Sequence, residues 1–516
     1  MRRRLHGSEA RHHDLVVGLA IVAVAAAVRL YGIGREPLWL DEGYSWWDAR
    51  QSFADLWRLV PQCDPHPPLY ALLLKGWSAI FGDSVEAMRA LGGVIGVAAT
   101  VAVMMAGREI GTRVGWIAGV MFAVAPFQIE YAHEARPYAL VSLGAAVAMF
   151  GLLRVVRTID DPRVPALPGW IAAVVGLAIM LWGNNTAVLF AGAAAVYAAV
   201  LFAFDRPSRR LVRPALIAAV AVAAIWLPYL PTLVEQARGV SSDFWIPRPD
   251  AWRVANELRF VVGLGRFDTL ALVLVVWAAG IAALWRHGAW RQAVLLFAMA
   301  ALPVMINLAV SLTVTPVYLA RALIGISPAF ALALACAIAA LRFGWLRVSA
   351  FVALAAARLV TATWLYVEDN RKEPWDEVAE HVLQQTHRET LVLLVPNELA
   401  LPLGHALSEE DESARVALRG LPVDFPAPGI PRARYPSGKC TPAIADHDLP
   451  GLAGVVKGRH EVLVVTRRNN VYDPRDRTQA TLRSLGMVEA SRREFRPGAI
   501  VVHRFVHPTT AAGGWP

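Results

Sequence analysis

The sequence predicts an α-helical polytopic membrane protein with about eleven transmembrane helices, followed by a small α/β domain outside the membrane. The first observation is composition: 56% of the 516 residues are hydrophobic and 18% are charged, whereas about a quarter of an ordinary soluble protein is charged. The second is that long apolar runs recur along the first 366 residues. Many approach the roughly 20 residues with which a helix crosses a 30 Å hydrocarbon layer. The runs lack the alternation of a membrane β-strand, so we expect helices.

The expected spans follow these apolar runs through a transmembrane domain that covers residues 1–366. They lie at 15–33, 86–106, 114–131, 137–153, 168–184, 186–204, 212–233, 268–285, 292–312, 319–341 and 347–366. The first run follows a basic stretch from Arg2 to His13, a combination that is also typical of a signal peptide. Because the run lacks a convincing small-residue cleavage site, we interpret it as an uncleaved first span.

The arginines indicate the sidedness of the chain. If the N-terminus is cytoplasmic, every short inside loop is basic, as the positive-inside rule requires. We therefore expect a multi-pass protein of the inner or plasma membrane, with segments 34–85 and 234–267 and the domain 367–516 on the extracytoplasmic side. These loops account for the net charge of +9, so membrane lipid is an expected partner and nucleic acid is not.

After residue 366 the composition changes to proline, charge and short apolar runs. The patterns predict a helix over 375–385 and strands over 390–395, 461–465 and 499–505, and hence a small α/β domain. Cys336 lies within a span, where it fills space as a small apolar residue. Cys63 and Cys440 both fall outside, where a disulfide persists, but the sequence leaves their pairing open. No cysteine cluster has zinc-ligand spacing.

Two adjacent carboxylates, Asp41 and Glu42, follow the first span in the sequence LWLDEGY. Ionisable groups close to hydrocarbon are costly and tend to be functional. A partly desolvated carboxylate here would serve as a general base that deprotonates an acceptor hydroxyl. The alternative is structural, since carboxylates also stabilise the N-terminus of an interfacial helix. Spacing alone favours neither interpretation.

A second group of polar residues lies in the sequence DPHPPLY. The prolines hold Asp64 and His66 in a rigid turn before an apolar helix. Such a turn suits a binding site, and it equally suits a capped turn with a polar histidine. The residues alone do not decide between the two.

The short outside connection YAHEARPY is unusually rich in ionisable residues. His133 or Glu134 would contact a sugar or a metal ion, and Tyr138, which begins the next span, is a further candidate for binding the donor or acceptor. Arg136 would pair with a phosphate or with Glu134. A purely structural Glu–Arg pair at the membrane rim is the alternative.

Three arginines, Arg89, Arg266 and Arg321, lie at outer ends of spans, where the positive-inside rule disfavours them. Each therefore requires a partner. A lipid-linked phosphate at the interface would be one, and lipid headgroups reached by the long side chain would be another.

Taken together, these motifs resemble those of the GT-C glycosyltransferase superfamily. The motifs on which this resemblance rests are LWLDEGYSW, DPHPPLY, AMRALGGVIG and YAHEARPYAL. Within the superfamily the chain resembles the group of family 39, the protein O-mannosyltransferases and the aminoarabinose transferases. FWIPRPD, PVYLARALIGISP and EPWDEVAEHV resemble later parts of its bacterial members, so the resemblance covers nearly the whole chain.

The resemblance implies a transferase that moves a sugar, a hexose or a pentose, from a polyprenyl-phosphate donor to an extracytoplasmic acceptor. A glycan, a glycolipid or a protein would serve as the acceptor. In the family the first-loop carboxylate is the supposed base, and it falls here on Asp41, with Glu42 beside it. The family's His-Pro-Pro turn places His66 near the site, and Arg89 falls on the arginine expected at the donor phosphate.

The chain departs from the family in two places. The turn of the O-mannosyltransferases continues as HPPLGK, whereas this chain has HPPLYALLLK, so Lys75 does not inherit the role of that lysine. The late Pro-Arg-Tyr motif appears as Pro316-Val317-Tyr318, with Arg321 displaced, and the role of Arg321 is open.

The expected reaction is a single inverting displacement. Asp41 takes the acceptor proton, and Arg89 stabilises the leaving phosphate together with Arg136 or Arg321. No cofactor is required, although His133 and Glu134 leave a divalent metal open.

Two alternative interpretations are that the protein is not an enzyme. A lipid-carrier flippase or secondary transporter would carry ionisable residues at mid-membrane, whereas here they crowd one face, which favours a transferase. A membrane anchor whose domain 367–516 only binds a partner would make the first-loop acids dispensable.

Overall fold

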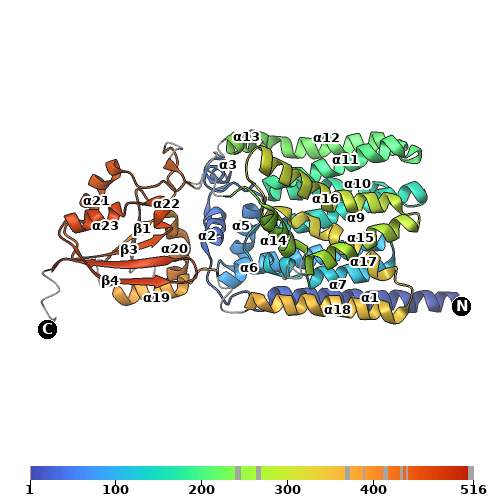
Figure 1. The fold of residues 1–516 in the computed structure, drawn as a ribbon, viewed down its shortest axis with the longest axis horizontal. Helices are drawn as coiled ribbons and strands as arrows, with labels where there is room; N and C mark the ends of the chain where they lie inside the picture. The colour runs from blue at the N-terminus through green and yellow to red at the C-terminus, as the bar shows by residue number, and fades with distance from the viewer. Residues whose placement is uncertain are drawn as a thin grey trace.

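The protein consists of a helical bundle joined end to end with a smaller domain built on a β-sheet (Figure 1). The computed structural model describes residues 2–238, 246–262, 269–366, 372–386, 390–410, 416–430, 434–436 and 440–508, with side chains from residue 12 onward. The N-terminus lies at the end of the bundle away from the sheet domain (Figure 1). Parts of the predicted outer segment 234–267, Arg266 and the predicted boundary after residue 366 lie outside the described residues.

The bundle is built from long apolar helices connected by short turns. Its elements are α1 (Arg2–Leu30), α5 (Leu69–Phe81), α6 (Val85–Arg108), α7 (Thr112–Ala123), α8 (Pro126–Glu130), α9 (Tyr138–Asp160), α10 (Leu167–Gly183), η1 (Asn185–Ala187), α11 (Val188–Phe204), η2 (Arg206–Leu211), α12 (Val212–Trp226), η3 (Leu227–Tyr229), α13 (Leu230–Arg238), α14 (Ala251–Val262), α15 (Leu270–Arg286), α16 (Trp290–Thr313), η5 (Ala320–Ile326), α17 (Ser327–Ala339), α18 (Gly344–Ala362) and η6 (Thr363–Tyr366). The helical membrane fold predicted from the sequence is confirmed.

Eight helical stretches in the described parts of the chain are long and apolar enough to cross a membrane, and they coincide with eight of the predicted spans. The predicted spans at 168–184 and 268–285 form α10 and α15, which are apolar but only 17 residues long each.

The remaining predicted span, 114–131, is wrong in extent. The helix α7 ends at Ala123, and the short helix α8 begins at Pro126. Proline disfavours helical backbone at the residue before it, and Ala125 is accordingly extended, with φ −72° and ψ 119°. The chain therefore leaves the helix before the expected end of the span.

The early end of α7 exposes carbonyl groups inside the bundle, where each needs a hydrogen-bond donor. Two buried arginines supply the donors. Arg29 of α1 donates to the carbonyls of Phe122 and Ala123 at 3.2 and 2.8 Å, and Arg358 of α18 donates to that of Met121 at 2.5 Å. These two arginines therefore cap a helix.

Glycines let α9 and α10 pack backbone to backbone. A Cβ atom added at Gly176 of α10 would lie 2.3 Å from the nitrogen of Ala148 in α9, and one at Gly151 of α9 would lie 2.3 Å from the nitrogen of Ala173. Small residues that allow such close approach are a common way for membrane helices to associate.

The loops that the sequence predicts to share one side of the membrane meet at one end of the bundle. Arg108 lies 3.7 Å from Asp14, and Glu109 pairs with Arg154 and Arg157 at 2.9 and 3.1 Å. Further pairs join Arg291 to Asp160 and Asp205. The sheet domain lies at the opposite end (Figure 1).

The sheet domain has five strands in the order β2-β1-β3-β5-β4. They are β1 (Leu391–Val395), β2 (Ala417–Gly420), β3 (Glu461–Arg467), β4 (Val488–Phe495) and β5 (Ile500–Val506). Strand β1 runs parallel to β2 and to the central strand β3, whereas β5 runs antiparallel to β3 and β4. The predicted strands at 390–395, 461–465 and 499–505 thus form three adjacent strands of one sheet.

Helices cover both faces of this sheet. The helices α19 (Trp375–Gln385) and α20 (Ala400–Glu409) pack on one face, and α21 (Leu449–Val456) and α23 (Arg477–Ser484) pack on the other. Successive residues of a strand point to opposite faces, so Leu393 and Leu394 of β1 enter different cores. The short elements η8 (Asn397–Leu399), η11 (Asp446–Asp448) and α22 (Asn469–Tyr472) complete the domain, and the predicted α/β class is confirmed.

Short helices of the first outer segment lie between the bundle and the sheet domain (Figure 1). They are α2 (Leu40–Arg50), α3 (Asp55–Arg58) and α4 (Val60–Cys63). Cys63 at the end of α4 forms a disulfide with Cys440 of the sheet domain, with 4.7 Å between their Cα atoms. The pairing that the sequence leaves open is therefore made.

We expect Gly176→Ala to destabilise the bundle, because the new methyl group would meet the backbone of α9 rather than a movable side chain. Overpacking of this kind costs about 1–3 kcal/mol. The matched control is Gly192→Ala in α11, where an added Cβ has no heavy atom within 4 Å. Thermal unfolding in detergent, followed by tryptophan fluorescence, measures both variants. Equal melting temperatures would show that α9 and α10 separate easily.

Candidate active site

Asp41 and Arg321 face each other at the sheet-domain end of the bundle. Asp41 is the second residue of α2, and Arg321 lies in η5. The Arg321 guanidinium donates to Asp41 Oδ2 at 3.2 Å. Their side chains are 18% and 25% exposed, so both are reachable from outside although they belong to a densely packed region. The structure thus brings together two residues separated by 280 positions.

Glu42, the neighbour of Asp41, is fully buried. Its Oε1 accepts from Arg89 Nε and from the backbone N–H of Ala135, both at 2.8 Å. Its Oε2 accepts from Arg89 NH2 at 2.6 Å and from the N–H of Trp39 at 3.4 Å. Burial alone would raise the pKa of Glu42, but the charge and hydrogen bonds of Arg89, with smaller contributions from Lys372 and Ala135, lower this pKa below its usual value.

Arg89 is buried as well, and its five donors are all used. Besides Glu42, it donates to the carbonyls of Ile33, Glu36 and Pro37 at 2.8, 2.9 and 3.0 Å. It therefore holds the turn between the first span and α2. In this arrangement neither Arg89 nor Glu42 presents an unused polar atom to a substrate.

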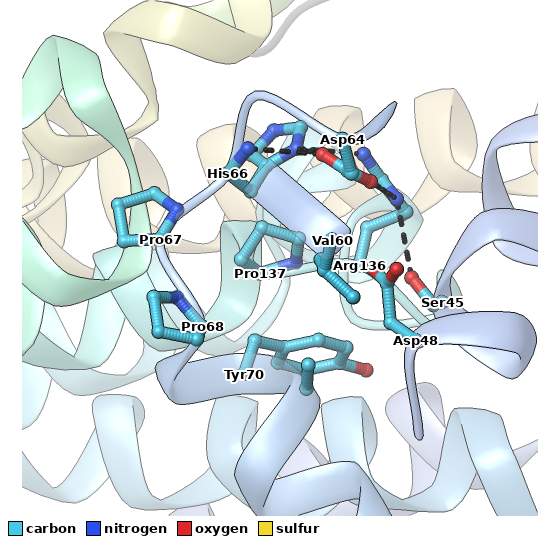
Figure 2. A pocket seen from close by; sticks show the side chains of 11 residues that line it. Ser45, Asp48, Val60, Asp64, His66, Pro67, Pro68, Tyr70, Arg136 and Pro137 are labelled. Atoms are coloured by element: carbon cyan, nitrogen blue, oxygen red, sulfur yellow. Dashed lines mark hydrogen bonds and ion pairs between the residues drawn. The ribbon is translucent and has the colours of Figure 1, made fainter. Parts of the chain in front are cut away.

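Asp64, His66 and Arg136 form a second cluster beside α2 (Figure 2). Asp64 Oδ1 lies 2.5 Å from His66 Nδ1, and Asp64 Oδ2 accepts from Arg136 at 3.0 Å. Arg136 NH2 lies 2.9 Å from the same His66 nitrogen, and Arg136 NH1 donates to the carbonyl of Asp41 at 2.9 Å. The rigid turn and the ionisable loop are thus joined to the first residues of α2.

A protonated His66 Nδ1 donates to Asp64, whereas an unprotonated Nδ1 accepts from Arg136, so the two contacts belong to different tautomers of the neutral ring. Burial lowers the pKa of His66, Arg136 and Arg321 lower it further, and Asp64 opposes them. The ring is therefore neutral at physiological pH. The ring of Tyr138 lies edge-on to it, with 6.1 Å between the ring centroids.

The other ionisable residues between α8 and α9 contact two different parts of the chain. Glu134 forms an ion pair with Lys372, which precedes α19. His133 Nε2 lies 3.2 Å from the carbonyl of Val28, and burial lowers the pKa of His133 to about 4. The expected pair between Arg136 and Glu134 is replaced by Arg136–Asp64 and Lys372–Glu134.

Lys372 and its neighbour Glu373 carry contacts that the sequence analysis missed. Glu373 Oε2 accepts from the N–H of Leu40 at 2.9 Å, so a residue of the sheet-domain segment caps the helix that carries Asp41. The two residues lie 333 positions apart, and no local sequence pattern connects them.

An apolar groove runs along α9, α10, α11 and α12 in the bundle. It is lined by side chains such as Trp170, Leu177, Leu201 and Trp226. One end lies close to η5, because Val188 of the groove follows η1 directly and Thr186 of η1 donates to the carbonyl of Ala322 at 3.3 Å. Ala322 is the neighbour of Arg321. This hydrogen bond therefore links the segment next to the groove with the segment that carries Arg321.

Among the described residues, no three histidine, cysteine, aspartate or glutamate side chains are grouped so that they would hold a metal ion. His133 and Glu134, which the sequence analysis left open for a metal, instead contact the Val28 carbonyl and Lys372.

We expect Arg89→Met to destabilise the protein by about 3–5 kcal/mol, because Glu42 would be left buried without its partner. The double variant Glu42→Gln/Arg89→Met should recover part of that stability. In the wild type, the contribution of Glu42 should be lost as the pH falls below its ordinary pKa of 4.5 and through its lowered folded value. Thermal unfolding at several pH values measures all three. An Arg89→Met protein that melts like the wild type but binds donor poorly would make Arg89 a phosphate ligand instead.

Residues 65–231 match the profile of the family described as dolichyl-phosphate-mannose-protein mannosyltransferase, and no curated protein matches the sequence. ArnT from Cupriavidus metallidurans in the apo state is similar with a TM-score of 0.61 and 16% identity, over 98% of this chain and 100% of that chain. The same protein bound to undecaprenyl phosphate gives 0.57 and 14%, with the same coverage.

The Archaeoglobus fulgidus oligosaccharyltransferase in complex with zinc and sulfate is also similar, with a TM-score of 0.50 and 13% identity, over 90% of this chain and 69% of that chain. The chain therefore has the fold of the GT-C membrane glycosyltransferases, and its resemblance to the mannosyltransferase and aminoarabinose-transferase group is confirmed.

Proposed function

We propose that the protein is a membrane glycosyltransferase that moves a sugar from a polyprenyl-phosphate donor to an acceptor hydroxyl outside the cytoplasm. The observation that carries the proposal is the accessible Asp41–Arg321 pair, in a bundle whose apolar groove adjoins η1, which in turn contacts η5. A lipid-linked sugar requires these elements together: an apolar path for the tail, a cation for the phosphate and a base for the acceptor. The similarity to ArnT and to the mannosyltransferase family supports the same reaction class.

In the proposed reaction, the donor phosphate takes the place of Asp41 as the partner of Arg321. The donor phosphate is a diester with one negative charge, like the carboxylate, and the charge that faces Arg321 grows as the bond from sugar to phosphate breaks. Asp41 then loses the positive charge of Arg321 beside it in a partly desolvated site, which makes it a stronger base. Binding of the donor thus prepares the base for the acceptor.

The chemical step is a direct displacement at the anomeric carbon. The acceptor oxygen forms a bond to that carbon while the bond from carbon to the phosphate oxygen breaks. The bonding electron pair leaves with the polyprenyl phosphate, whose charge Arg321 stabilises. The acceptor proton moves to Asp41. Configuration inverts, and the step as written needs no bound metal.

The neighbouring cluster suits recognition of the sugar rather than proton transfer. In the tautomer that donates from Nδ1 to Asp64, neutral His66 offers Nε2 as an acceptor for a sugar hydroxyl. We assign Glu42 and Arg89 to the support of α2, since their polar atoms are used inside the protein. This changes the expectation that Arg89 binds the phosphate and gives that role to Arg321.

We propose a hexose or a pentose as the transferred sugar and a glycan, a glycolipid or a protein as its acceptor. A flippase or secondary transporter is the weaker candidate. The buried arginines of the bundle, Arg29 and Arg358, cap α7 and are not arranged along a path between the two ends.

We expect Asp41→Asn to slow transfer of a radiolabelled sugar from its polyprenyl-phosphate carrier by about 10²-fold or more, because the amide cannot accept the acceptor proton. The control is Asp161→Asn, which removes a carboxylate at the opposite end of the bundle. Unchanged transfer by Asp41→Asn would exclude Asp41 as the base. A wild type that consumes no lipid-linked sugar would favour transport.

We also propose that the N-terminus is cytoplasmic and that the sheet domain is extracytoplasmic. The clustering of the basic loops at the end opposite the sheet domain supports this orientation. A reporter enzyme that is active only outside the cytoplasm, fused after residue 370, should be active. The same reporter fused within the loop near Arg108 should be inactive. The reverse pattern would place the site on the cytoplasmic side and exclude an extracytoplasmic acceptor.

A further inference from the structure

The N-terminus of α2 lacks a capping side chain of its own. The first backbone N–H groups of a helix have no partner within the helix, and Trp39, at the capping position, has no side-chain oxygen. Glu42 reaches back to the N–H of Trp39, and Glu373 of the sheet-domain segment accepts from the N–H of Leu40 at 2.9 Å. A carboxylate at this position is also favoured by the helix dipole.

Glu373 is itself held firmly. It is buried, and its Oε2 also accepts from the indole of Trp375 at 2.7 Å. Its Oε1 accepts from Arg467, the last residue of strand β3. Three donors from three parts of the chain therefore converge on two carboxylate oxygens. The start of α2 is connected in this way to the centre of the sheet.

Lys372, the residue before Glu373, makes a second set of contacts with the bundle and with the residue before α2. Its ammonium group pairs with Glu134 and lies 4.7 Å from the centre of the Trp39 ring. The charges of Glu134, Glu130 and Glu42 outweigh burial and raise the pKa of Lys372, so the lysine stays charged. The segment 372–375 thus contacts both the ionisable loop and the first turn of α2.

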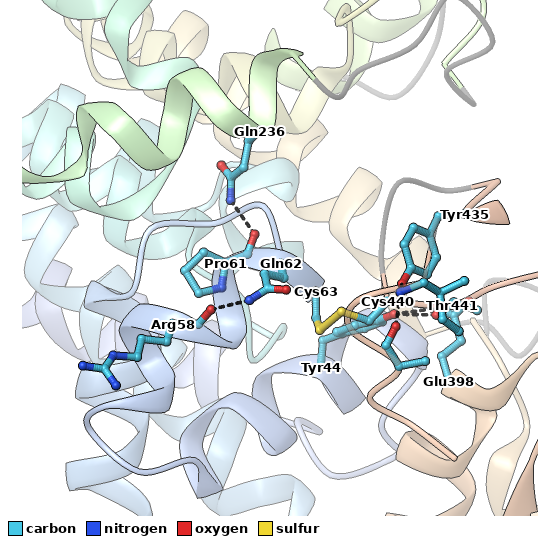
Figure 3. The surroundings of a disulfide bond; sticks show 12 residues. Tyr44, Arg58, Pro61, Gln62, Cys63, Gln236, Glu398, Tyr435, Cys440 and Thr441 are labelled. Carbon is cyan, nitrogen blue, oxygen red and sulfur yellow. Dashed lines mark hydrogen bonds between the residues drawn. A yellow bond between two sulfur atoms is a disulfide. The ribbon is translucent and has the colours of Figure 1, made fainter. Parts of the chain in front are cut away.

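The remaining length of α2 packs directly on the sheet domain. The hydroxyl of Tyr44 donates to Glu398 of η8 (Figure 3), and burial together with Glu398 raises the pKa of Tyr44 well above its usual value. A Cβ atom at Gly43 would lie 3.0 Å from Leu401 Cβ of α20, so a larger residue here would push the two helices apart by a few tenths of an ångström. The Cys63–Cys440 disulfide closes the same interface nearby (Figure 3).

We infer that Glu373 is a positioning residue for Asp41, and that the sheet domain therefore completes the catalytic site instead of only selecting an acceptor. Asp41 lies between Leu40, whose N–H is held by Glu373, and Glu42, which is held by Arg89. The direction of its carboxylate toward Arg321 consequently depends on both anchors. The inference rests on the proposed function, because it assigns Asp41 the role of base.

The test variant is Glu373→Gln. Its amide keeps one acceptor oxygen but directs N–H groups at donors, so at least one of the three present hydrogen bonds is lost. We expect kcat for transfer from the polyprenyl-phosphate sugar to fall about 10- to 100-fold with little change in the KM for donor, because displacement of the base affects chemistry more than binding. The matched control is Glu380→Gln on the exposed side of α19, which should retain wild-type rates.

Two further measurements separate positioning from general damage. Glu373→Gln should add no further loss in the background of Asp41→Asn, because a residue that acts through Asp41 has no effect once the base is gone. Hydrogen exchange of the peptide that contains residues 38–45 should become faster in Glu373→Gln, whereas exchange of α9 should stay unchanged. If Glu373→Gln cannot be recovered folded, Glu373→Asp replaces it, since the charge is kept and only the reach is shortened.

The outcomes are distinguishable. A wild type that transfers no lipid-linked sugar overturns the proposed function together with this inference. An active wild type whose Glu373→Gln variant is equally active, or whose residues 38–45 exchange at the wild-type rate, overturns the inference alone. Slower transfer with faster exchange in α2, and no added effect in the Asp41→Asn background, supports it.

Discussion

The buried ion pair between Glu42 and Arg89 is the constraint on which the outer end of the molecule depends. Burying two charges costs several kcal/mol each unless their hydrogen bonds are satisfied. Here the remaining donors of Arg89 are taken up by the turn at residues 33–37, and Glu42 also accepts from Ala135. One pair thereby joins the end of the first span, the helix α2, the second span and the ionisable loop. These hydrogen bonds offset the free energy of burying the two charges, and they also fix the geometry of the site.

The same pair explains why two adjacent carboxylates have different environments. Consecutive residues of an α-helix differ in direction by about 100°. When Glu42 turns into the protein toward Arg89, Asp41 turns toward the opening, where Arg321 meets it. The sequence analysis weighed catalysis against helix support for this pair of acids. In the structure each acid takes one of the two positions: Glu42 supports the helix, and Asp41 faces the accessible region.

Patterns that repeat within a segment were sufficient to predict most of the fold. Apolar runs identified the eight long spans, and short apolar runs identified β1, β3 and β5. The prediction failed at residues 114–131, because hydropathy does not register the effect of Pro126 on the preceding backbone. Nor did it anticipate that Arg29 and Arg358 would cap the resulting helix end, since each contact joins helices far apart in the chain.

In the candidate site, too, local patterns were predictable from the sequence and contacts between distant parts of the chain were not. Its residues were found because charged side chains are conspicuous beside apolar spans, and Asp41, Arg321, Asp64, His66 and Arg136 do lie together. Their partners were not predictable, because a pair such as Leu40–Glu373 or Cys63–Cys440 depends on how two domains dock. Glu373 looks, in sequence, like an acid at the start of an ordinary helix. Only its position in space distinguishes it.

The docking of the two domains has a consequence for the order of the proposed reaction. Arg321 belongs to the bundle, whereas the first turn of α2 is anchored on one side by the sheet domain and on the other by Arg89. The acidic partner of Arg321 is therefore held in place from outside the groove that would contain the donor lipid. A phosphate that enters from the groove can draw Arg321 away without carrying Asp41 along. The base then remains on the side from which a water-borne or membrane-surface acceptor arrives, with the sugar between it and the leaving phosphate. That arrangement, a cation tied to the lipid side and a base tied to the acceptor side, is the one that an in-line displacement requires.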